Sequence, residues 1–204
     1  MDFNLKNKRA LVCGGSKGIG RAVAEAYAAE GANLVLNARD PKRLEQTAAD
    51  IRATYGTEVS IFPCDITERS SVQAMVQESD AQKPIDILVN NAGIYKPLPF
   101  VEYEFEDFQN IIDVNLYGVI HVTQFMLKNM MARESGVILN MASTAGKWGS
   151  RNQSAYNMSK HAIVGLTRCL GLEMAPHNIR ANAICPFIVK TDLSETFLGG
   201  HAEV

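Results

Sequence analysis

A tyrosine and a lysine lie four residues apart in the segment SAYNMSK, which spans residues 154–160. Side chains at positions i and i+4 share one face of a helix, so the Lys160 ammonium can reach the region of the Tyr156 phenol. The pKa of an ordinary tyrosine is about 10, and a nearby cation lowers it by stabilising the phenolate. The pair could therefore serve proton transfer. The same spacing is common in pairs that only occupy a helix surface, so the choice depends on the rest of the sequence.

Two further polar residues, Ser143 and Asn115, lie at positions where a polar side chain suggests a specific function. Ser143 ends an apolar run at residues 136–143 that predicts a strand, and open α/β sheets bind ligands at the carboxyl ends of their strands. The alternative is a serine that only bonds nearby loop backbone. Asn115 lies within a long helical pattern at residues 104–133, although asparagine is a poor helix former. This predicts a local kink or a function for the Asn115 amide.

A glycine cluster marks another site. The segment CGGSKGIG, residues 13–20, lies between the first expected strand and the first expected helix. Glycines allow a tight turn and a close approach of the backbone to a pyrophosphate, and the helix N-terminus beyond them favours an anion. A glycine cluster is weak support by itself, but its place between strand and helix predicts a dinucleotide site.

The end of the second expected strand bears on the choice of dinucleotide. An acid there would accept the free ribose hydroxyls of NAD(H), but the chain has Ala38 followed by Arg39. A guanidinium can bind a ribose phosphate bidentately, and Lys17 could add a second positive charge. Asp40 is a competing acid one position later, and both cations could instead be solvated surface residues. We expect NADP(H) to be preferred over NAD(H).

Strand and helix patterns alternate along the chain. Short apolar runs predict strands at residues 9–15, 33–38, 59–65, 85–93, 136–143 and 179–186, and helical patterns predict helices at residues 18–32, 40–56, 67–82, 104–133 and 154–176. Such alternation indicates an α/β fold of the doubly wound type, a parallel sheet with helices on both faces. We expect residues 1–204 to form a single dinucleotide-binding domain.

The composition argues against several classes of partner. The chain of 204 residues has a formal net charge of −2, which gives no basis for a nucleic-acid partner. It has no apolar run long enough for a membrane span or a signal peptide. Its 4 His residues lack metal-ligand spacing, and its 4 Cys residues form no C-x-x-C pair. We therefore expect a cytoplasmic protein with free thiols, no metal site and no membrane partner.

The motifs CGGSKGIG, NNAG, NMAS and YNMSK occur in this order. With a serine 13 residues before the tyrosine of the YxxxK element, their combination resembles the short-chain dehydrogenase/reductase family from about residue 9 to residue 192. The resemblance implies a Rossmann fold with strand order 3-2-1-4-5-6 and NAD(P)-dependent chemistry on carbonyls and alcohols. It also implies a homotetramer or homodimer formed through the long fourth and fifth helices.

Carried over by position, the resemblance implies four catalytic residues. Tyr156 resembles the family's proton donor and acceptor, and Lys160 resembles the residue that lowers the tyrosine pKa and binds the nicotinamide ribose. Ser143 resembles the serine that orients the substrate oxygen, and Asn115 resembles the asparagine that fixes a water in the proton relay. The expected cofactor contacts, including Lys17 and Arg39 from the charge argument above, are Gly14, Ser16, Lys17, Gly18, Ile19, Gly20, Arg39, Asp65, Asn90, Gly93, Tyr156, Lys160 and Thr191.

Three features depart from the family pattern. Cys13 replaces a threonine, which should remove one turn hydrogen bond at most. Phe187 replaces a glycine, so either its ring crowds the nicotinamide side of the pocket or the backbone takes another path, and both outcomes bear on the Thr191 contact. The usual C-terminal strand is also absent after residue 192, which would leave the sixth strand as an exposed edge if this is the natural chain and not a fragment.

The sequence leaves the substrate open among acyl thioesters, sugars, steroids and xenobiotic carbonyls. Tyr95, Trp148 and Phe187 could line an apolar pocket or pack loops and subunit contacts. Lys147 and Arg151 could attract an acidic substrate or remain solvated. The leading interpretation is an oxidoreductase that transfers a hydride between NADP(H) and a ketone or secondary alcohol. The alternatives are a non-catalytic dinucleotide-binding or regulatory protein and an NAD(H)-dependent sugar or steroid dehydrogenase.

Overall fold

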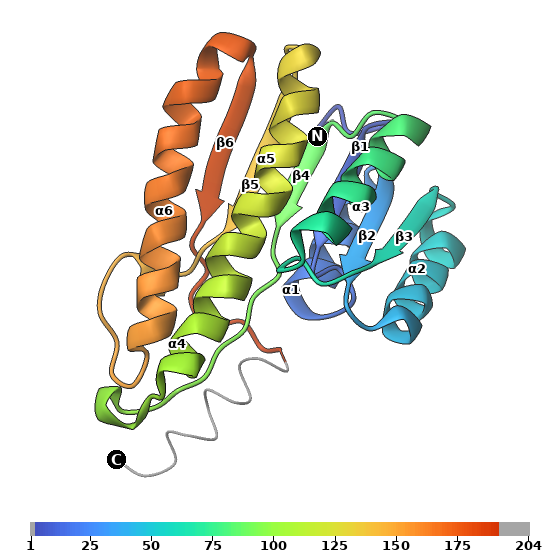
Figure 1. Cartoon of the computed structure of the whole chain (residues 1–204). Helices are drawn as coiled ribbons and strands as arrows, with labels where there is room; N and C mark the ends of the chain where they lie inside the picture. The colour runs from blue at the N-terminus through green and yellow to red at the C-terminus, as the bar shows by residue number, and fades with distance from the viewer. Residues whose placement is uncertain (1–2, 192–204) are drawn as a thin grey trace.

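Six parallel strands form the central sheet of the computed structural model, which describes residues 3–191 (Figure 1). The strands are β1 (Arg9–Cys13), β2 (Asn33–Ala38), β3 (Val59–Pro63), β4 (Ile87–Asn90), β5 (Gly136–Met141) and β6 (Ile179–Ile184). Their order across the sheet is β3-β2-β1-β4-β5-β6, and neighbouring strands run parallel. The predicted fold class and strand order are thus confirmed. The predicted absence of a further strand concerns residues 192–204, which lie outside the described part of the chain.

Helices cover both faces of this sheet. They are α1 (Gly18–Ala29), α2 (Pro41–Tyr55), α3 (Arg69–Gln82), α4 (Phe105–Ile112), α5 (Gly118–Ala132) and α6 (Ser154–Met174). Short 3-10 helices occur at Phe100–Glu102, Thr144–Gly146 and Ala175–His177. The first two α-helices pack on one face, and α3, α5 and α6 pack on the other. Every strand and α-helix falls within a range predicted from the sequence.

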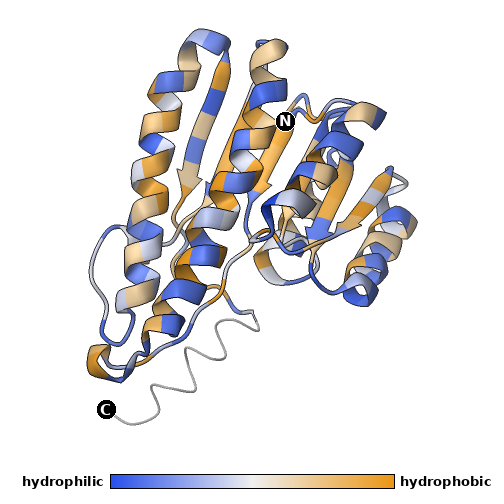
Figure 2. Cartoon of the chain, viewed as in Figure 1, coloured by the Kyte–Doolittle hydropathy of each residue, from blue (hydrophilic) through white to orange (hydrophobic). Residues whose placement is uncertain are grey.

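Alternate residues of the strands supply two hydrophobic layers, as expected for a sheet that is covered on both faces. In β1, Leu11 and Cys13 belong to the layer with α3, α5 and α6, whereas Ala10 and Val12 belong to the layer with α1 and α2. All four side chains are fully buried. Figure 2 shows the strands as largely apolar and the outer sides of the helices as polar. The sheet is therefore a firm support for the loops at the carboxyl ends of its strands.

Three residues set the ends of α2. The Asp40 carboxylate accepts hydrogen bonds from the backbone N–H groups of Lys42 and Arg43, at 3.0 and 3.1 Å, and so caps the helix N-terminus. Pro41 occupies the first turn, and Gly56 ends the helix with a φ of 68°. This capping role accounts for the acid that competed with Arg39 in the sequence.

The helix predicted at residues 104–133 is interrupted around Asn115. Residues Asp113–Tyr117 form a π-helical turn between α4 and α5. Asn115 lies in this turn and is only 1% exposed. π-turns inside helices often occur at functional sites. A π-helical turn thus occupies the place where the poor helix propensity of asparagine predicted a kink, and the amide makes the hydrogen bonds described below.

Membrane-spanning helices and metal sites would each indicate one of the classes of protein considered above. None of the helices within residues 3–191 combines the length and the apolarity that crossing a bilayer requires. No three His, Cys, Asp or Glu side chains in the same range gather as a possible metal site. The four cysteines are free thiols, with Cys13 buried and Cys169 exposed.

Candidate active site

Ser143, Tyr156 and Lys160 line one cavity of about 190 Å³ beside the carboxyl ends of β4, β5 and β6. Ser143 belongs to the turn after β5, and the other two lie one turn apart on α6. The structure therefore brings together three of the four predicted catalytic residues. Asn115 lies behind the wall of this cavity: a Cβ built on Gly93, which lines it, would be 3.3 Å from Asn115 Oδ1 and 3.7 Å from Lys160 Nζ.

The Lys160 side chain is buried, with 5% of its surface exposed. Its Nζ donates a hydrogen bond to the backbone carbonyl oxygen of Met141, the last residue of β5, at 2.8 Å. Burial lowers the pKa of Lys160 to about 8, and the nearby Cys185 acts in the opposite direction. This hydrogen bond ties α6 to β5 at the point where the chain leaves the strand toward Ser143.

The pKa of Tyr156 is displaced in the direction opposite to the one expected. Burial raises it, and the Ser143 hydroxyl beside the phenol acts against this rise. The Lys160 ammonium lies 5.6 Å from the centroid of the Tyr156 ring and donates its hydrogen bond to Met141, and the rise caused by burial outweighs any lowering by this cation. The Tyr156 phenol consequently keeps its proton at neutral pH.

Backbone contacts on both sides hold Ser143 in place. Its Oγ accepts a hydrogen bond from the N–H of Ala145 at 3.1 Å and so caps the short helix Thr144–Gly146. The N–H of Thr144 donates to the carbonyl oxygen of Pro186 at 2.9 Å, which ties this turn to the segment after β6. Ser143 thus bonds nearby backbone, as one interpretation of the sequence held, and also lines the cavity, as the other held.

The Asn115 amide fastens the segment that follows β4. Its Oδ1 accepts from the N–H of Ile94 at 2.8 Å, and its Nδ2 donates to the carbonyl oxygen of Ile94 at 3.0 Å. Nδ2 also donates to Ser159 Oγ on α6 at 3.1 Å. The π-turn therefore joins the loop after β4 to the helix that carries Tyr156.

The glycine loop between β1 and α1 has the conformation that its composition predicts. Gly14 and Gly18 have positive φ values of 73° and 54°. A Cβ on Gly20 would lie 2.1 Å from the carbonyl oxygen of Gly14, so α1 packs directly on the loop. The α1 N-terminus adds unpaired N–H groups and a partial positive charge. This cradle fits a pyrophosphate.

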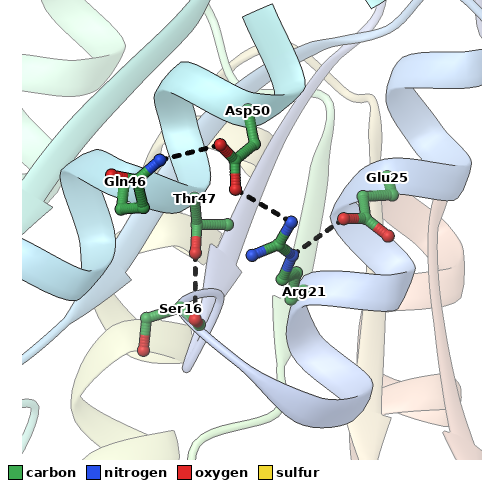
Figure 3. A network of polar contacts seen from close by, with 6 residues as sticks. All are labelled: Ser16, Arg21, Glu25, Gln46, Thr47 and Asp50. Atoms are coloured by element: carbon green, nitrogen blue, oxygen red, sulfur yellow. Dashed lines mark hydrogen bonds and ion pairs between the residues drawn. The ribbon is translucent and has the colours of Figure 1, made fainter. Parts of the chain in front are cut away.

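Residues of α2 hold the glycine loop in place (Figure 3). The Thr47 hydroxyl donates to the carbonyl oxygen of Ser16 at 3.0 Å, and Thr47 is 1% exposed. Arg21 on α1 donates to Glu25 at 2.8 Å and to Asp50 on α2 at 3.0 Å. The two helices and the loop therefore form one connected unit, which sequence reasoning did not foresee.

A second cavity, of about 540 Å³, runs along this loop. It adjoins the first cavity, because both are lined by Ile19, Asn91, Gly93, Tyr95 and Thr191. Most predicted cofactor contacts line it, namely Gly14, Ser16, Lys17, Gly18, Ile19, Arg39, Asp65, Gly93 and Thr191. The adjoining cavities and the glycine cradle fit an extended dinucleotide whose reactive end lies near Tyr156.

Gly20 and Asn90 line neither cavity. Asn90 ends β4, and its buried Nδ2 donates to Thr123 Oγ1 and Asn140 Oδ1, both at 2.9 Å. Its side chain follows the alternation of the strand into the layer of α5, so it supports the sheet. The cavity position predicted for Asn90 is occupied by Asn91, which also donates to the carbonyl oxygen of Gly14 at 3.1 Å.

Three positively charged side chains line the second cavity. The Arg39 side chain is 68% exposed, and its Nη1 lies 3.7 Å from Asp65 Oδ2. Lys17 and Arg43 line the same cavity. Sequence reasoning missed Arg43, although a cation in the first turn of the helix after Arg39 was a usable signal. The exposure of Arg39 leaves its guanidinium able to turn toward a bound anion.

Phe187 and Thr191 show how the chain continues after β6. Phe187 lines the cavity of Ser143, Tyr156 and Lys160 while 71% of its surface is exposed, so the ring lies at the rim. Its φ is not positive, so the backbone takes a path that accepts a side chain. Thr191 reaches the glycine loop, because a Cβ on Gly18 would lie 3.4 Å from Thr191 Cγ2.

The aromatic and charged residues that were predicted near the substrate pocket differ in position. Tyr95 and Trp148 line the cavity that holds Tyr156, as one of the two expectations for them held. Lys147 and Arg151 are exposed and are not part of its wall. Gln153 was missed; it is 6% exposed and lines the cavity just before α6. A glutamine before a helix gives no signal of burial, so only the fold could reveal it.

Comparisons with known proteins agree with this geometry. A family model described as short chain dehydrogenase matches residues 8–199. The 3-oxoacyl-acyl-carrier-protein reductase FabG of Aquifex aeolicus is 33% identical over 195 residues, which cover 95% of this chain and 79% of the relative. The crystal structure of levodione reductase has a TM-score of 0.92 and 35% identity, with 95% of this chain and 76% of that chain covered. The structure of L-sorbose reductase from Gluconobacter frateurii, complexed with NADPH and L-sorbose, has a TM-score of 0.91 and 31% identity, with 94% and 73% covered.

Proposed function

The chain belongs to the short-chain dehydrogenase/reductase family, whose members are oxidoreductases that act on CH–OH groups, and we propose that it transfers a hydride between NADP(H) and a ketone or secondary alcohol. One observation carries this proposal. The residues suited to proton transfer line one cavity, and the glycine loop with its neighbouring cations lines the adjoining one. A dinucleotide that occupies both cavities would supply the hydride beside the proton donor.

Tyr156 is the proton donor in this proposal. Reduction of a ketone leaves an oxygen that must receive a proton, and the raised pKa of Tyr156 keeps its phenol protonated at neutral pH. The Ser143 hydroxyl, beside that phenol, would hold the same substrate oxygen. A donor that keeps its proton supports reduction as the direction favoured at neutral pH.

Lys160 and Asn115 act on this donor in different ways. The Lys160 ammonium stands over the Tyr156 ring and is directed at the end of β5, where it would bind a ribose hydroxyl and stabilise a phenolate once the proton has left. Asn115 holds the backbone of Ile94 and the start of α6. Its proposed part is to fix this frame, together with the relay water that the resemblance implies.

The proposed preference for NADP(H) rests on the cations of the second cavity. Arg39, Lys17 and Arg43 line this cavity, as does the competing acid Asp40, whose carboxylate caps α2. A ribose 2′-phosphate would find a bidentate partner in Arg39 and additional positive charge around it. The 31% identical L-sorbose reductase structure with NADPH bound is consistent with this choice.

A panel of ketones and secondary alcohols, assayed with NADPH, NADH and their oxidised forms, tests the function. We expect NADPH oxidation that depends on an added ketone. In Tyr156→Phe this turnover should fall by about 100-fold or more, while NADPH binding, measured by fluorescence, stays near the wild-type value. Wild-type binding of NADPH without turnover of any panel member would favour a non-catalytic role. Turnover confined to NADH with sugars or steroids would favour the alternative dehydrogenase.

Self-association is part of the same proposal. Tyr117, Met158 and Leu172 lie on or next to α5 and α6 and are 50%, 48% and 79% exposed, respectively. Large apolar side chains exposed on long helices are suited to subunit contacts. We expect a homodimer or homotetramer in a cytoplasmic setting. A light-scattering mass at the monomer value would contradict it.

A further inference from the structure

A second tyrosine packs against Tyr156 from another part of the fold. The rings of Tyr95 and Tyr156 lie edge to face, with centroids 5.2 Å apart and planes inclined by 82°. Tyr95 lies five residues after the end of β4 and lines both cavities. The mechanism proposed above gives it no task. Tyr95 is therefore the side chain of the loop after β4 that packs directly against the proposed proton donor, Tyr156.

Two neighbouring residues act on Tyr95. The residue before it, Ile94, is bound through both its N–H and its carbonyl oxygen by Asn115. Burial raises the Tyr95 pKa, and the side chain of the buried Gln153, next to the start of α6, acts in the opposite direction. The net pKa of Tyr95 is about 12, so this ring stays a neutral phenol at any pH at which the enzyme would work.

We propose that Tyr95 is a positioning residue for Tyr156: its ring fixes the direction of the Tyr156 phenol toward Ser143 and shields that phenol from water. The inference deepens the proposed function and rests on it for the consequence in catalysis. Edge-to-face aromatic pairs restrict both rings, and the backbone just before Tyr95 is fixed through Asn115. The ring would therefore be set before any substrate arrives.

The shielding has a consequence for titration. The groups that face Tyr156 are Lys160 on α6, Tyr95 after β4 and the non-titrating Ser143 after β5, with Cys185 beside Lys160 and Tyr103 beside Tyr95. Burial is the larger cause of the raised Tyr156 pKa. Removing the Tyr95 ring admits water, so the Tyr156 pKa should fall toward its ordinary value. The phenol must be protonated to donate, so reduction should then be lost at lower pH than in the wild type.

Three variants test the inference: Tyr95→Phe keeps the ring, Tyr95→Leu keeps most of the apolar volume, and Tyr95→Ala removes both. Tyr55→Ala, on the exposed end of α2, is the matched control. The Tyr156 titration is followed directly by NMR of tyrosine labelled at Cζ, with the signal assigned by its loss in Tyr156→Phe. Turnover of NADPH with a ketone from the panel is measured over the same pH range.

We expect Tyr95→Phe and the control to retain the wild-type titration and kcat. Tyr95→Ala should lower kcat by about 3- to 10-fold, with the NADPH KM unchanged, and should move both the Tyr156 titration and the alkaline limb of kcat to lower pH. Tyr95→Leu, which loses the ring but keeps most of the apolar cover, should lower kcat with a smaller shift of the titration. An unmoved titration in the Leu and Ala variants, a rise in substrate KM alone, or an equal loss in Tyr95→Phe would overturn the inference. If the wild type lacks turnover, the proposed function fails, whereas the NMR titration still decides the role of Tyr95.

Discussion

The Lys160 ammonium donates a hydrogen bond to the backbone carbonyl oxygen of Met141 at 2.8 Å, in a place where only 5% of the lysine is exposed. One neutral acceptor compensates a buried ammonium only in part, and burial accordingly lowers the Lys160 pKa to about 8. Such unfavourable burial of an ionisable group is frequent at functional sites. It makes Lys160 a residue whose removal should affect stability and activity in opposite directions.

Replacing Lys160 with methionine should therefore stabilise the protein and stop turnover. The folded-state pKa of about 8 lies below the ordinary value of 10.5, so the unfolded chain binds more protons between these two pH values and wild-type stability rises with pH in this window. The advantage of Lys160→Met should be greatest below pH 8, on the order of 2–3 kcal/mol, and should shrink toward pH 10.5. Urea unfolding at pH 7 and pH 10 measures it. An equal effect at both pH values would contradict the burial argument.

Gly20→Ala should prevent the first turn of α1 from packing on the glycine loop. The new Cβ would lie 2.1 Å from the carbonyl oxygen of Gly14 and 2.4 Å from Asn91 Nδ2. The backbone must move, so we expect a loss of stability of several kcal/mol, on the order of 3, and loss of NADPH binding. Thermal unfolding and fluorescence titration measure the two effects. Gly165→Ala in α6, where a Cβ meets nothing within 4 Å, should leave binding unchanged.

The sequence could place the strands, the helices and the glycine loop because each depends on local patterns. It could not choose between Asn90 and Asn91, because that choice depends on which way each side chain leaves the end of β4. The direction of the Tyr156 pKa shift could not be predicted from the sequence either. Spacing along one helix shows that Lys160 is near, whereas the burial of Tyr156 comes from segments that meet only in the folded chain.

Thr47→Val should weaken cofactor binding although Thr47 lines neither cavity. The buried hydroxyl supports the glycine loop through the carbonyl oxygen of Ser16. Losing one such bond should cost about 1 kcal/mol of stability and, because the loop loses its support, raise the NADPH Kd by about 3- to 10-fold. Isothermal titration calorimetry gives the Kd. Thr54→Val, at an exposed position of α2, is the control, and an equal Kd in the two variants would refute the role of Thr47.

Arg39→Ala should reduce affinity for NADPH and leave affinity for NADH unchanged. The exposed ion pair of Arg39 with Asp65, at 3.7 Å, contributes little by itself, so the substitution isolates the phosphate contact. We expect the NADPH Kd to rise by about 10- to 100-fold, and the wild-type preference for NADPH to decrease as salt is added. Arg168→Ala, on the exposed side of α6, is the control. A parallel loss for both dinucleotides would argue against a ribose phosphate partner.

Asn115→Leu should destabilise the fold. The change removes the partners of the N–H and the carbonyl oxygen of Ile94 and the donor to Ser159 Oγ, which keeps only its own bond to Tyr156. The expected loss is about 2–4 kcal/mol of unfolding free energy, measured by urea denaturation. Asn110→Leu, at an exposed position of α4, should change stability by less than about 0.5 kcal/mol. Similar midpoints for the two variants would show that the amide contributes little.

The π-turn at Asp113–Tyr117 also makes this region sensitive to chain length. Deleting one residue there would restore a regular helix, and each residue of an α-helix is rotated by about 100° from the one before it. The side chains of α5 would then turn away from the sheet relative to those of α4, and Asn115 would leave Ile94. In the helical segment from Phe105 to Ala132, substitutions on the side that faces away from the sheet should be tolerated. The deletion of a single codon in the π-turn should not be tolerated.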